Sequence, residues 1–203
     1  MFLSYPVVII GVDPGMAEGK PIAAVPCGFG EGETVVLYPI QRDIPLGASF
    51  MDKLLMWWET IAAYAKAVPL TLRADGALVC VACETARGVG GSGWALQALV
   101  TFVREIVEQK PMALFVPVIG ISRFIPVNPS EAKKYVAANG RADAETVARF
   151  VEAIVRNPQN IPPSKEYDYH AACAVAITAY RKLCAEQLLL LGDGNGTQDQ
   201  QDH

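Results

Sequence analysis

Three acidic residues stand where regular elements can deliver a carboxylate to the surface. Asp13 follows the apolar run 7–12 and Glu84 follows the apolar run 78–83, as strand-end residues do. Asp168 lies early in the last helix expected in the chain, where a carboxylate also suits the helix dipole. Carboxylate oxygens are the preferred protein ligands of Mg²⁺ and Mn²⁺. If the three side chains meet, they predict a divalent-metal site.

A meeting of these carboxylates has a chemical consequence. Without a cation, carboxylates a few ångströms apart repel one another, and one of them must take up a proton. Two divalent ions roughly 4 Å apart can activate a water molecule and stabilise the leaving oxygen of a phosphodiester. Asp13 alone could equally be a capping residue that only accepts hydrogen bonds from turn amides. Nuclease chemistry therefore depends on the arrival of Glu84 and Asp168 at the same place.

The two strand-end acids meet only if their strands are parallel neighbours. Between them, Ser49 can cap a helix that Pro69 ends, and parallel neighbours require such a crossover. Three short strands joined by Gly-rich turns precede this helix and indicate an antiparallel meander. We therefore expect an α/β fold in which a mixed sheet (antiparallel meander plus parallel strands) is flanked by helices.

Local signals place the individual elements. Strands are expected at residues 7–13, 22–25, 34–38, 78–83 and 115–119, with a turn at 28–32. Helices are expected from 50 to 68, from 94 to about 109, from Pro129 (capped by Asn128) to Asn139, from 141 or 143 to 156, and from Lys165 (capped by Ser164) to about 191. The pair Trp57 and Trp58 is interpreted as core and flank rather than as a base-stacking platform.

Composition bounds the class of protein. The 203 residues predict one domain, 1–191, with a disordered acidic tail at 192–203. The net charge of −4 is uneven, because residues 185–203 hold four acids and no Lys or Arg, which leaves 17 acidic and 17 basic residues in the rest. No apolar run reaches about eighteen residues and no basic leader is present, so neither a membrane span nor a signal peptide is expected. Five scattered cysteines indicate reduced thiols and a cytoplasm-like compartment, that of a bacterial or phage-infected cell or an organelle matrix.

Two further segments could contact a substrate. The Gly-rich stretch 87–93 opens a helix, but it lacks the Lys of a P-loop and the spacing of a dinucleotide fingerprint, so it is interpreted as a substrate-facing loop. Segment 123–149 holds five basic and three acidic residues. That modest excess fits a solvated helix face as well as a DNA contact.

The chain resembles the RNase H-like domains and, more narrowly, the RuvC-type Holliday-junction resolvases. The resemblance spans about residues 7–184. The matching motifs, in chain order, are Ile10-Gly11-Val12-Asp13-Pro14-Gly15, Cys83-Glu84, Ala132-Lys133-Lys134 followed by Asn139-Gly140-Arg141-Ala142-Asp143, and Asp168 followed by Ala172-Cys173-Ala174-Val175-Ala176.

The resemblance implies a homodimeric endonuclease that cuts two strands of a four-way DNA junction symmetrically. It implies that Asp13, Glu84 and Asp168 bind Mg²⁺ (or Mn²⁺) and that Lys133 lies near the scissile phosphate. The residues expected to contact DNA are Arg87, Lys133, Lys134 and Arg141.

Three positions depart from the family pattern. The family's fourth acid falls three residues after the third, where this chain has Ala171, and a second family lysine falls at Ala144. The adjacent His170 is about 200° around the helix from Asp168 and is a poor substitute. The family pattern also has an aromatic wedge residue just beyond the second acid. In this chain, near Arg87, that aromatic residue is replaced.

These departures leave several functions open. A junction-binding protein of the same fold that has lost cleavage is the first alternative, and a transposase-like strand-cutting nuclease is another. A strand followed by Asp and a turn also opens the actin-like sugar kinases and ATPases. Those proteins need a duplicated domain with a second phosphate loop, and this chain shows no repeat and is too short for one.

Overall fold

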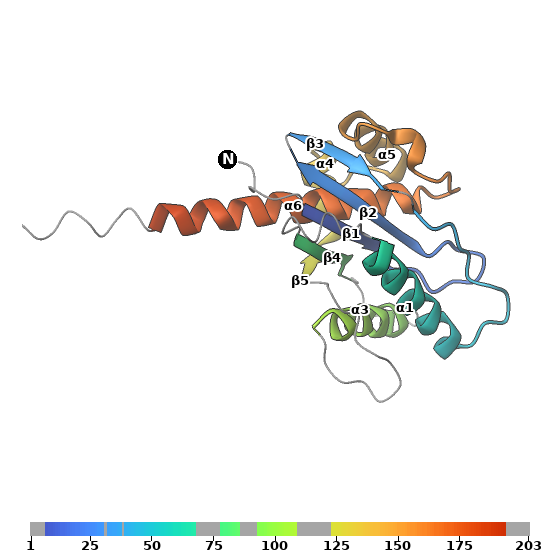
Figure 1. Cartoon of the computed structure of the whole chain (residues 1–203). Helices are drawn as coiled ribbons and strands as arrows, with labels where there is room; N and C mark the ends of the chain where they lie inside the picture. The colour runs from blue at the N-terminus through green and yellow to red at the C-terminus, as the bar shows by residue number, and fades with distance from the viewer. Residues whose placement is uncertain are drawn as a thin grey trace, which may run out of the picture.

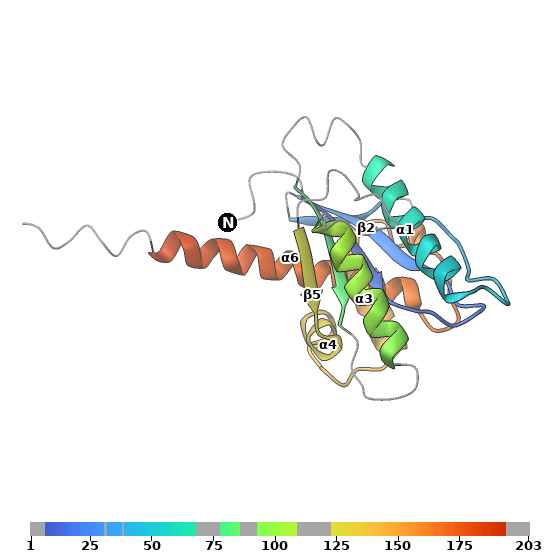
Figure 2. The same cartoon turned by 90° about the horizontal axis from the view of Figure 1, so that it is seen from below.

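A five-stranded mixed sheet lies at the centre of the protein, with helices on both faces (Figure 1, Figure 2). The computed structural model describes residues 7–30, 32–37, 39–67, 78–85, 93–108 and 123–193. The elements are β1 (Val7–Asp13), β2 (Ala23–Gly30), β3 (Glu33–Val36), α1 (Phe50–Ala67), β4 (Leu78–Glu84), α3 (Gly93–Val107), β5 (Arg123–Val127), α4 (Pro129–Ala137), α5 (Ala144–Ile154), a 3₁₀ turn (Pro158–Asn160) and α6 (Asp168–Asp193). The strand order is β3-β2-β1-β4-β5. The expected fold class is confirmed.

β1 is the central strand, and it is buried on both faces. It pairs antiparallel with β2 and parallel with β4. Val8 and Ile10 pack with α1 and α3 on one face, while Val7 and Ile9 pack with α4, α5 and α6 on the other. This two-sided burial explains the unbroken β-branched run, because each face of the strand needs apolar side chains. The expected parallel pairing of the first and fourth strands is confirmed.

A glycine sets the distance between β1 and α6. A Cβ built on Gly11 would lie 2.0 Å from the carbonyl oxygen of Ala172 and 3.0 Å from the Cβ of Ala176. α6 therefore crosses the centre of the sheet at a distance that only glycine on the strand and alanine on the helix permit. The crossing brings the first turn of α6 to the edge where β1 and β4 end.

Two strands differ from the sequence-based expectations. β2 continues through Gly28, which was expected in a turn, because Phe29 stacks on Tyr180 of α6 with ring centroids 4.4 Å apart. The fifth strand is Arg123–Val127 rather than 115–119, and 115–119 lies outside the described residues. Pro126 is tolerated in β5 because this strand is at the sheet edge and pairs only with β4 among the described strands.

The helix starts are mostly as expected, with one exception. Asn128 caps α4 in a capping box with Glu131, and Asp143 caps α5. The expected start of the last helix at Lys165 is wrong. α6 begins at Asp168, because Tyr167 adopts a left-handed backbone with φ of 59° and separates the preceding turn from the helix.

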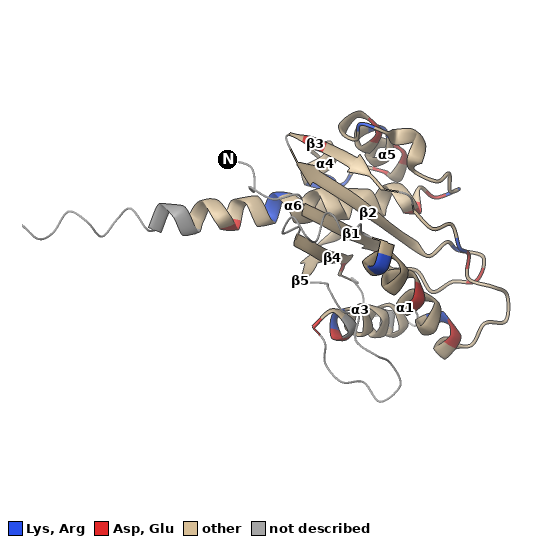
Figure 3. Ribbon diagram, viewed as in Figure 1, with Lys and Arg blue, Asp and Glu red and all other residues tan. Residues whose placement is uncertain are grey.

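α3 has an uneven distribution of charge. The charged side chains Arg104 and Glu105 lie at its C-terminal end, and the rest of the helix carries none (Figure 3). Trp94, at the other end, is 63% exposed. Trp57 on α1 is fully buried and Trp58 is partly buried, which confirms their interpretation as core and flank.

Two findings bear on the remaining sequence-based expectations. Among the described residues, no helix combines the length and the apolar character that crossing a bilayer would require. Cys80 and Cys83 are buried on opposite faces of β4, so this C-x-x-C pair does not face a common ligand. The tail beyond Asp193 lies outside the described residues.

Candidate active site

Asp13 and Glu84 emerge side by side at one edge of the sheet. They end β1 and β4, and the parallel register that aligns Val12 with Cys83 sets the two acids next to each other. The pKa of Asp13 is raised to about 8, chiefly by burial and then by the negative charges of Glu84 and Asp168, while Lys20 acts in the opposite direction. The Asp13 carboxyl group therefore senses both of the other acids predicted from the sequence.

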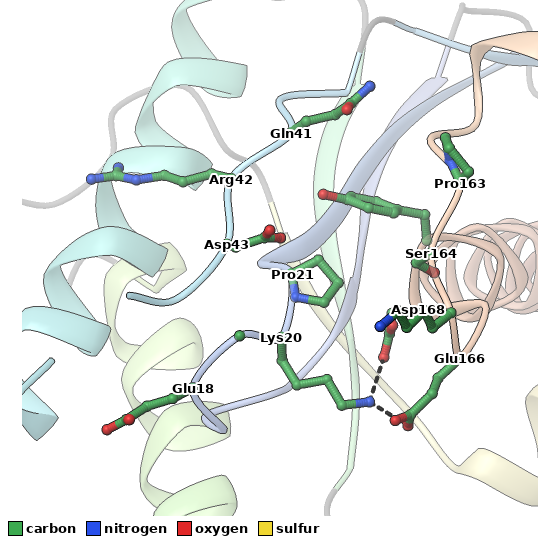
Figure 4. A pocket seen from close by; sticks show the side chains of 13 residues that line it. Glu18, Lys20, Pro21, Gln41, Arg42, Asp43, Pro163, Ser164, Glu166 and Asp168 are labelled. Atoms are coloured by element: carbon green, nitrogen blue, oxygen red, sulfur yellow. Dashed lines mark hydrogen bonds and ion pairs between the residues drawn. The ribbon is translucent and has the colours of Figure 1, made fainter. Parts of the chain in front are cut away.

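Asp168 reaches this edge as the first residue of α6. Its side chain is 16% exposed, and its Oδ1 accepts a hydrogen bond from Lys20 Nζ at 3.3 Å. The same ammonium group pairs with Glu166, two residues earlier in the turn before the helix (Figure 4). The close crossing of α6 over Gly11 explains why an acid 155 residues after Asp13 lies near it, because the helix start follows from the crossing point.

The loop that follows Asp13 is held by a side chain from α1. Trp57 is fully buried, and its Nε1 donates a hydrogen bond to the carbonyl oxygen of Gly15 at 3.1 Å. This bond fixes the turn at Pro14-Gly15 that ends β1. Trp57 was interpreted from the sequence as a core residue only, and its polar contact with this loop was missed.

A small hollow of about 80 Å³ lies on the α4 side of Glu84. Lys133 lines it together with Glu84 and Tyr167. Ala144 and Ala171, the two positions where a lysine and a fourth acid were expected from the family pattern, line the same hollow. The motif residues therefore gather beside Glu84, and the two departures leave methyl groups where charged groups were expected.

Two of the remaining predicted DNA-contacting residues lie on or beside α4. Lys134 is exposed on α4, and Arg141 is exposed in the turn between α4 and α5. Arg87 and the rest of the segment 86–92 lie outside the described residues.

His170 does not replace the missing acid. It is nearly buried, and its Nε2 lies 3.1 Å from Oε1 of Glu152 on α5. The imidazole thus faces α5, in agreement with the helical-wheel expectation that it points away from Asp168.

A larger open cavity of about 680 Å³ has Asp168 in its lining (Figure 4). Lys20 and Glu166 line it, and neither was predicted from the sequence as a site residue. One signal was available for Lys20, which is the only basic residue between Asp13 and Arg42. Glu166 gave no such signal, because the left-handed residue Tyr167 that turns it toward Lys20 has no obvious sequence marker.

The donor set at this edge suits a hard cation. Asp13 and Glu84 offer carboxylate oxygens, and burial together with the negative charges of Glu84 and Asp168 raises the pKa of Asp13, an effect that a bound cation would offset. Within the described parts of the chain, no three His, Cys, Asp or Glu side chains are already close enough together to hold a metal ion. Asp168 is instead engaged with Lys20.

Solved structures share this arrangement of strands and helices over most of the chain. The Thermus thermophilus RuvC structure matches with a TM-score of 0.51 and 22% identity, over 86% of this chain and 94% of that chain. T. thermophilus RuvC in complex with Holliday junction substrate matches with a TM-score of 0.56 and 20% identity, over 87% of this chain and 96% of that one. The chain has the RuvC fold.

A third solved structure with this fold is eukaryotic and shares less sequence identity with this chain. The yeast mitochondrial Holliday junction resolvase Ydc2 matches with a TM-score of 0.53 and 12% identity, over 89% of this chain and 82% of that chain. Comparison of the sequence with family models and with curated proteins gives no match. The likeness to RuvC is therefore one of backbone arrangement rather than of overall sequence.

Proposed function

We propose that this chain is a structure-selective DNA endonuclease that binds four-way junctions as a homodimer and hydrolyses phosphodiesters with a divalent metal ion. The observation that carries the proposal is the placement of Asp13 and Glu84 at adjacent parallel strand ends, with Asp168 near enough to raise the pKa of Asp13. The solved RuvC structure with a Holliday junction, which has the same fold, supports a branched DNA substrate.

Each polar residue of the sheet edge has a role in this proposal. Asp13, Glu84 and Asp168 would hold Mg²⁺ or Mn²⁺, which supplies activation of the attacking water and neutralisation of charge on the phosphodiester. Lys133, beside Glu84, places a positive charge where a phosphate oxygen would approach. Trp57 and the Gly11 crossing act as positioning features, because they fix the loop after Asp13 and the start of α6.

DNA binding and dimerisation extend the proposal beyond the carboxylates. Lys134 and Arg141 are exposed near the hollow at Lys133, so they can contact the phosphates of the strand that leads to the site. Arg87 is proposed to contact DNA together with them. The uncharged length of α3 with its exposed Trp94 is proposed as the seam between two subunits.

A second candidate is a junction-binding protein without cleavage. The observation that favours it is the pair of methyl groups at Ala144 and Ala171, which remove a cation and an anion from the hollow beside Glu84. Such a protein would keep the fold and the DNA-binding surface while lacking a complete catalytic set.

One experiment separates the two candidates. A labelled four-way junction and a linear duplex of the same sequence are titrated with the protein in Mg²⁺, for the wild type and for Ala171→Asp. The endonuclease proposal predicts tighter binding of the junction than of the duplex, and paired nicks in the junction. Tight junction binding without nicks in either protein would favour the binder. Equal affinity for both DNAs together with no nicks would contradict both candidates.

A further inference from the structure

Lys20 brings a fixed positive charge into the carboxylate site. Its Nζ lies 3.3 Å from Oδ1 of Asp168 and also pairs with Glu166. The Lys20 side chain is 30% exposed, and it approaches from the loop between β1 and β2, while Glu166 lies in the turn before α6 and Asp168 is the first residue of that helix (Figure 4). The pair thus joins segments almost 150 residues apart.

The backbone of Lys20 is held in place by a neighbouring segment. The Lys20 carbonyl oxygen accepts a hydrogen bond from the Ile44 amide at 2.9 Å, and the Gly19 amide donates to the Ile44 carbonyl oxygen at 2.8 Å. Ile44 itself is 1% exposed and belongs to the core with α1 and α3. Gly19 adopts φ of 73°, the left-handed turn conformation that glycine favours and that leads the chain into Lys20. The ammonium group is therefore presented from a fixed backbone.

The number of carboxylates at this edge of the sheet limits the number of cations that are needed to neutralise them. The three least exposed acids there are Asp13, Glu84 and Asp168, while Glu166 is 68% exposed and largely screened by water. One ammonium group and one divalent ion balance three carboxylates. A second divalent ion would need a further acid, and Ala171 occupies the position where the family pattern supplies it.

We propose that the Lys20 ammonium group stands in for a second divalent ion, so that each chain binds one metal ion and uses Lys20 as a catalytic cation. This inference rests on the proposed endonuclease function. An ammonium group has three N–H donors. Within the described part of the chain, Asp168 and Glu166 engage the ammonium group, which leaves one N–H for a phosphodiester oxygen on which negative charge develops.

The number of metal ions tests this inference without relying on activity. Mn²⁺ is titrated calorimetrically into the full-length protein in the absence of DNA. We expect one ion per chain for the wild type and for Lys20→Arg. We expect two for the double variant Lys20→Met with Ala171→Asp, which removes the ammonium and supplies the missing acid. Two ions in the wild type, or one in the double variant, would overturn the inference.

The matched control carries the same Ala171→Asp change but replaces a lysine that lies outside the site. Lys53 pairs with Glu18 at 3.7 Å on the nearby loop and does not touch Asp168. The double variant Lys53→Met with Ala171→Asp should therefore still bind one ion. A second ion in this control would overturn the inference, because it would show that Lys20 does not exclude one. Thermal unfolding of each variant confirms that it is folded.

Cleavage of a four-way junction in Mg²⁺ supplies a separate readout. Lys20→Met should lower the single-turnover rate by about 100-fold, as loss of one transition-state donor does, while Lys20→Arg retains most of the rate. Junction affinity should be unchanged. An unchanged rate in Lys20→Met would overturn the catalytic part. No cleavage by the wild type would refute the endonuclease function itself, and the Mn²⁺ count would then decide the inference on the number of ions.

Discussion

Gly11 and Ala172 are in closer contact than any side chain on the strand would allow. A Cβ on Gly11 would lie 2.0 Å from the Ala172 carbonyl oxygen, which is a backbone atom and cannot rotate aside. The start of α6 lies only four residues before this contact. The same contact therefore determines both the packing of α6 on β1 and the position of Asp168.

Replacement of Gly11 should separate the helix from the strand. Gly11→Ala is expected to lower the free energy of unfolding by about 3 kcal/mol, because the helix must shift to admit one methyl group in a tightly packed core. It should also weaken Mn²⁺ binding, since the shift moves Asp168. Gly15→Ala is the control, because nothing lies within 4 Å of a Cβ there and it should be tolerated. Equal stability of the two variants in urea unfolding would contradict the account of this crossing.

The stability of the metal-free protein should fall as the pH rises. The pKa of Asp13 is raised from 3.8 to about 8, so between these values the folded protein holds a proton that the unfolded chain has released. The contribution of Asp13 to the free energy of unfolding is therefore greatest below about pH 4, and it is lost completely above about pH 8. Asp13→Asn should remove this contribution to the pH dependence of stability.

Urea unfolding in EDTA measures this effect. At pH 8.5 Asp13→Asn should be more stable than the wild type by on the order of 2 kcal/mol, a value that allows for the partial exposure of the residue. Mg²⁺ should reduce the difference, because a bound cation stabilises the ionised carboxylate. If the free energies of unfolding of the two proteins differ by the same amount at every pH from 4 to 8.5, Asp13 is not protonated in the folded state.

Two neighbouring lysines on α4 should have separable effects. Lys133 lines the hollow with Glu84, whereas Lys134 is exposed. Lys133→Ala should lower the cleavage rate at saturating protein by about 100-fold, since it removes a charge beside the reacting phosphate. Lys134→Ala should weaken junction binding and reduce its salt dependence by about one phosphate contact, with the saturated rate unchanged. The reverse pattern would show that the roles assigned to the two residues are wrong.

A charged substitution on α3 should disrupt the proposed dimer. Trp94 is 63% exposed on the uncharged part of the helix and contacts the Phe50 ring at 5.3 Å between centroids. Trp94→Asp should convert a dimer into a monomer in light scattering at micromolar concentration. Leu189→Asp is a matched control, because Leu189 is 70% exposed and lies near the C-terminal end of α6. That helix projects from the rest of the protein (Figure 1). A monomeric wild type, or a dimer disrupted only by the Leu189 change, would exclude this seam.

The sequence predicted those parts of the fold that depend on local patterns. The buried strand 7–13, the helix capped by Asn128 and the pairing of the strands that end at Asp13 and Glu84 were all expected from apolar runs and capping residues. The crossover helix between two such strands indicates a parallel pair, and a parallel pair leaves both acids at one edge.

The features that the sequence did not reveal depend on distant contacts. β2 is longer than its apolar run because Phe29 stacks on Tyr180, and the strand Arg123–Val127 is less apolar than the segment 115–119, where the apolar pattern predicts a strand. Lys20 meets Glu166 across nearly the whole chain, and their contact depends on the left-handed backbone of Tyr167. No local pattern encodes a contact of that kind.

The most direct test of the account is anomalous diffraction from crystals of the full-length protein soaked in Mn²⁺. We expect an anomalous peak between the carboxylates of Asp13 and Glu84, with Lys20 still paired to Asp168, and no such peak in Asp13→Asn. A fully soaked wild-type crystal with no peak at the ends of β1 and β4 would contradict the claim that this edge of the sheet is a metal-dependent nuclease site.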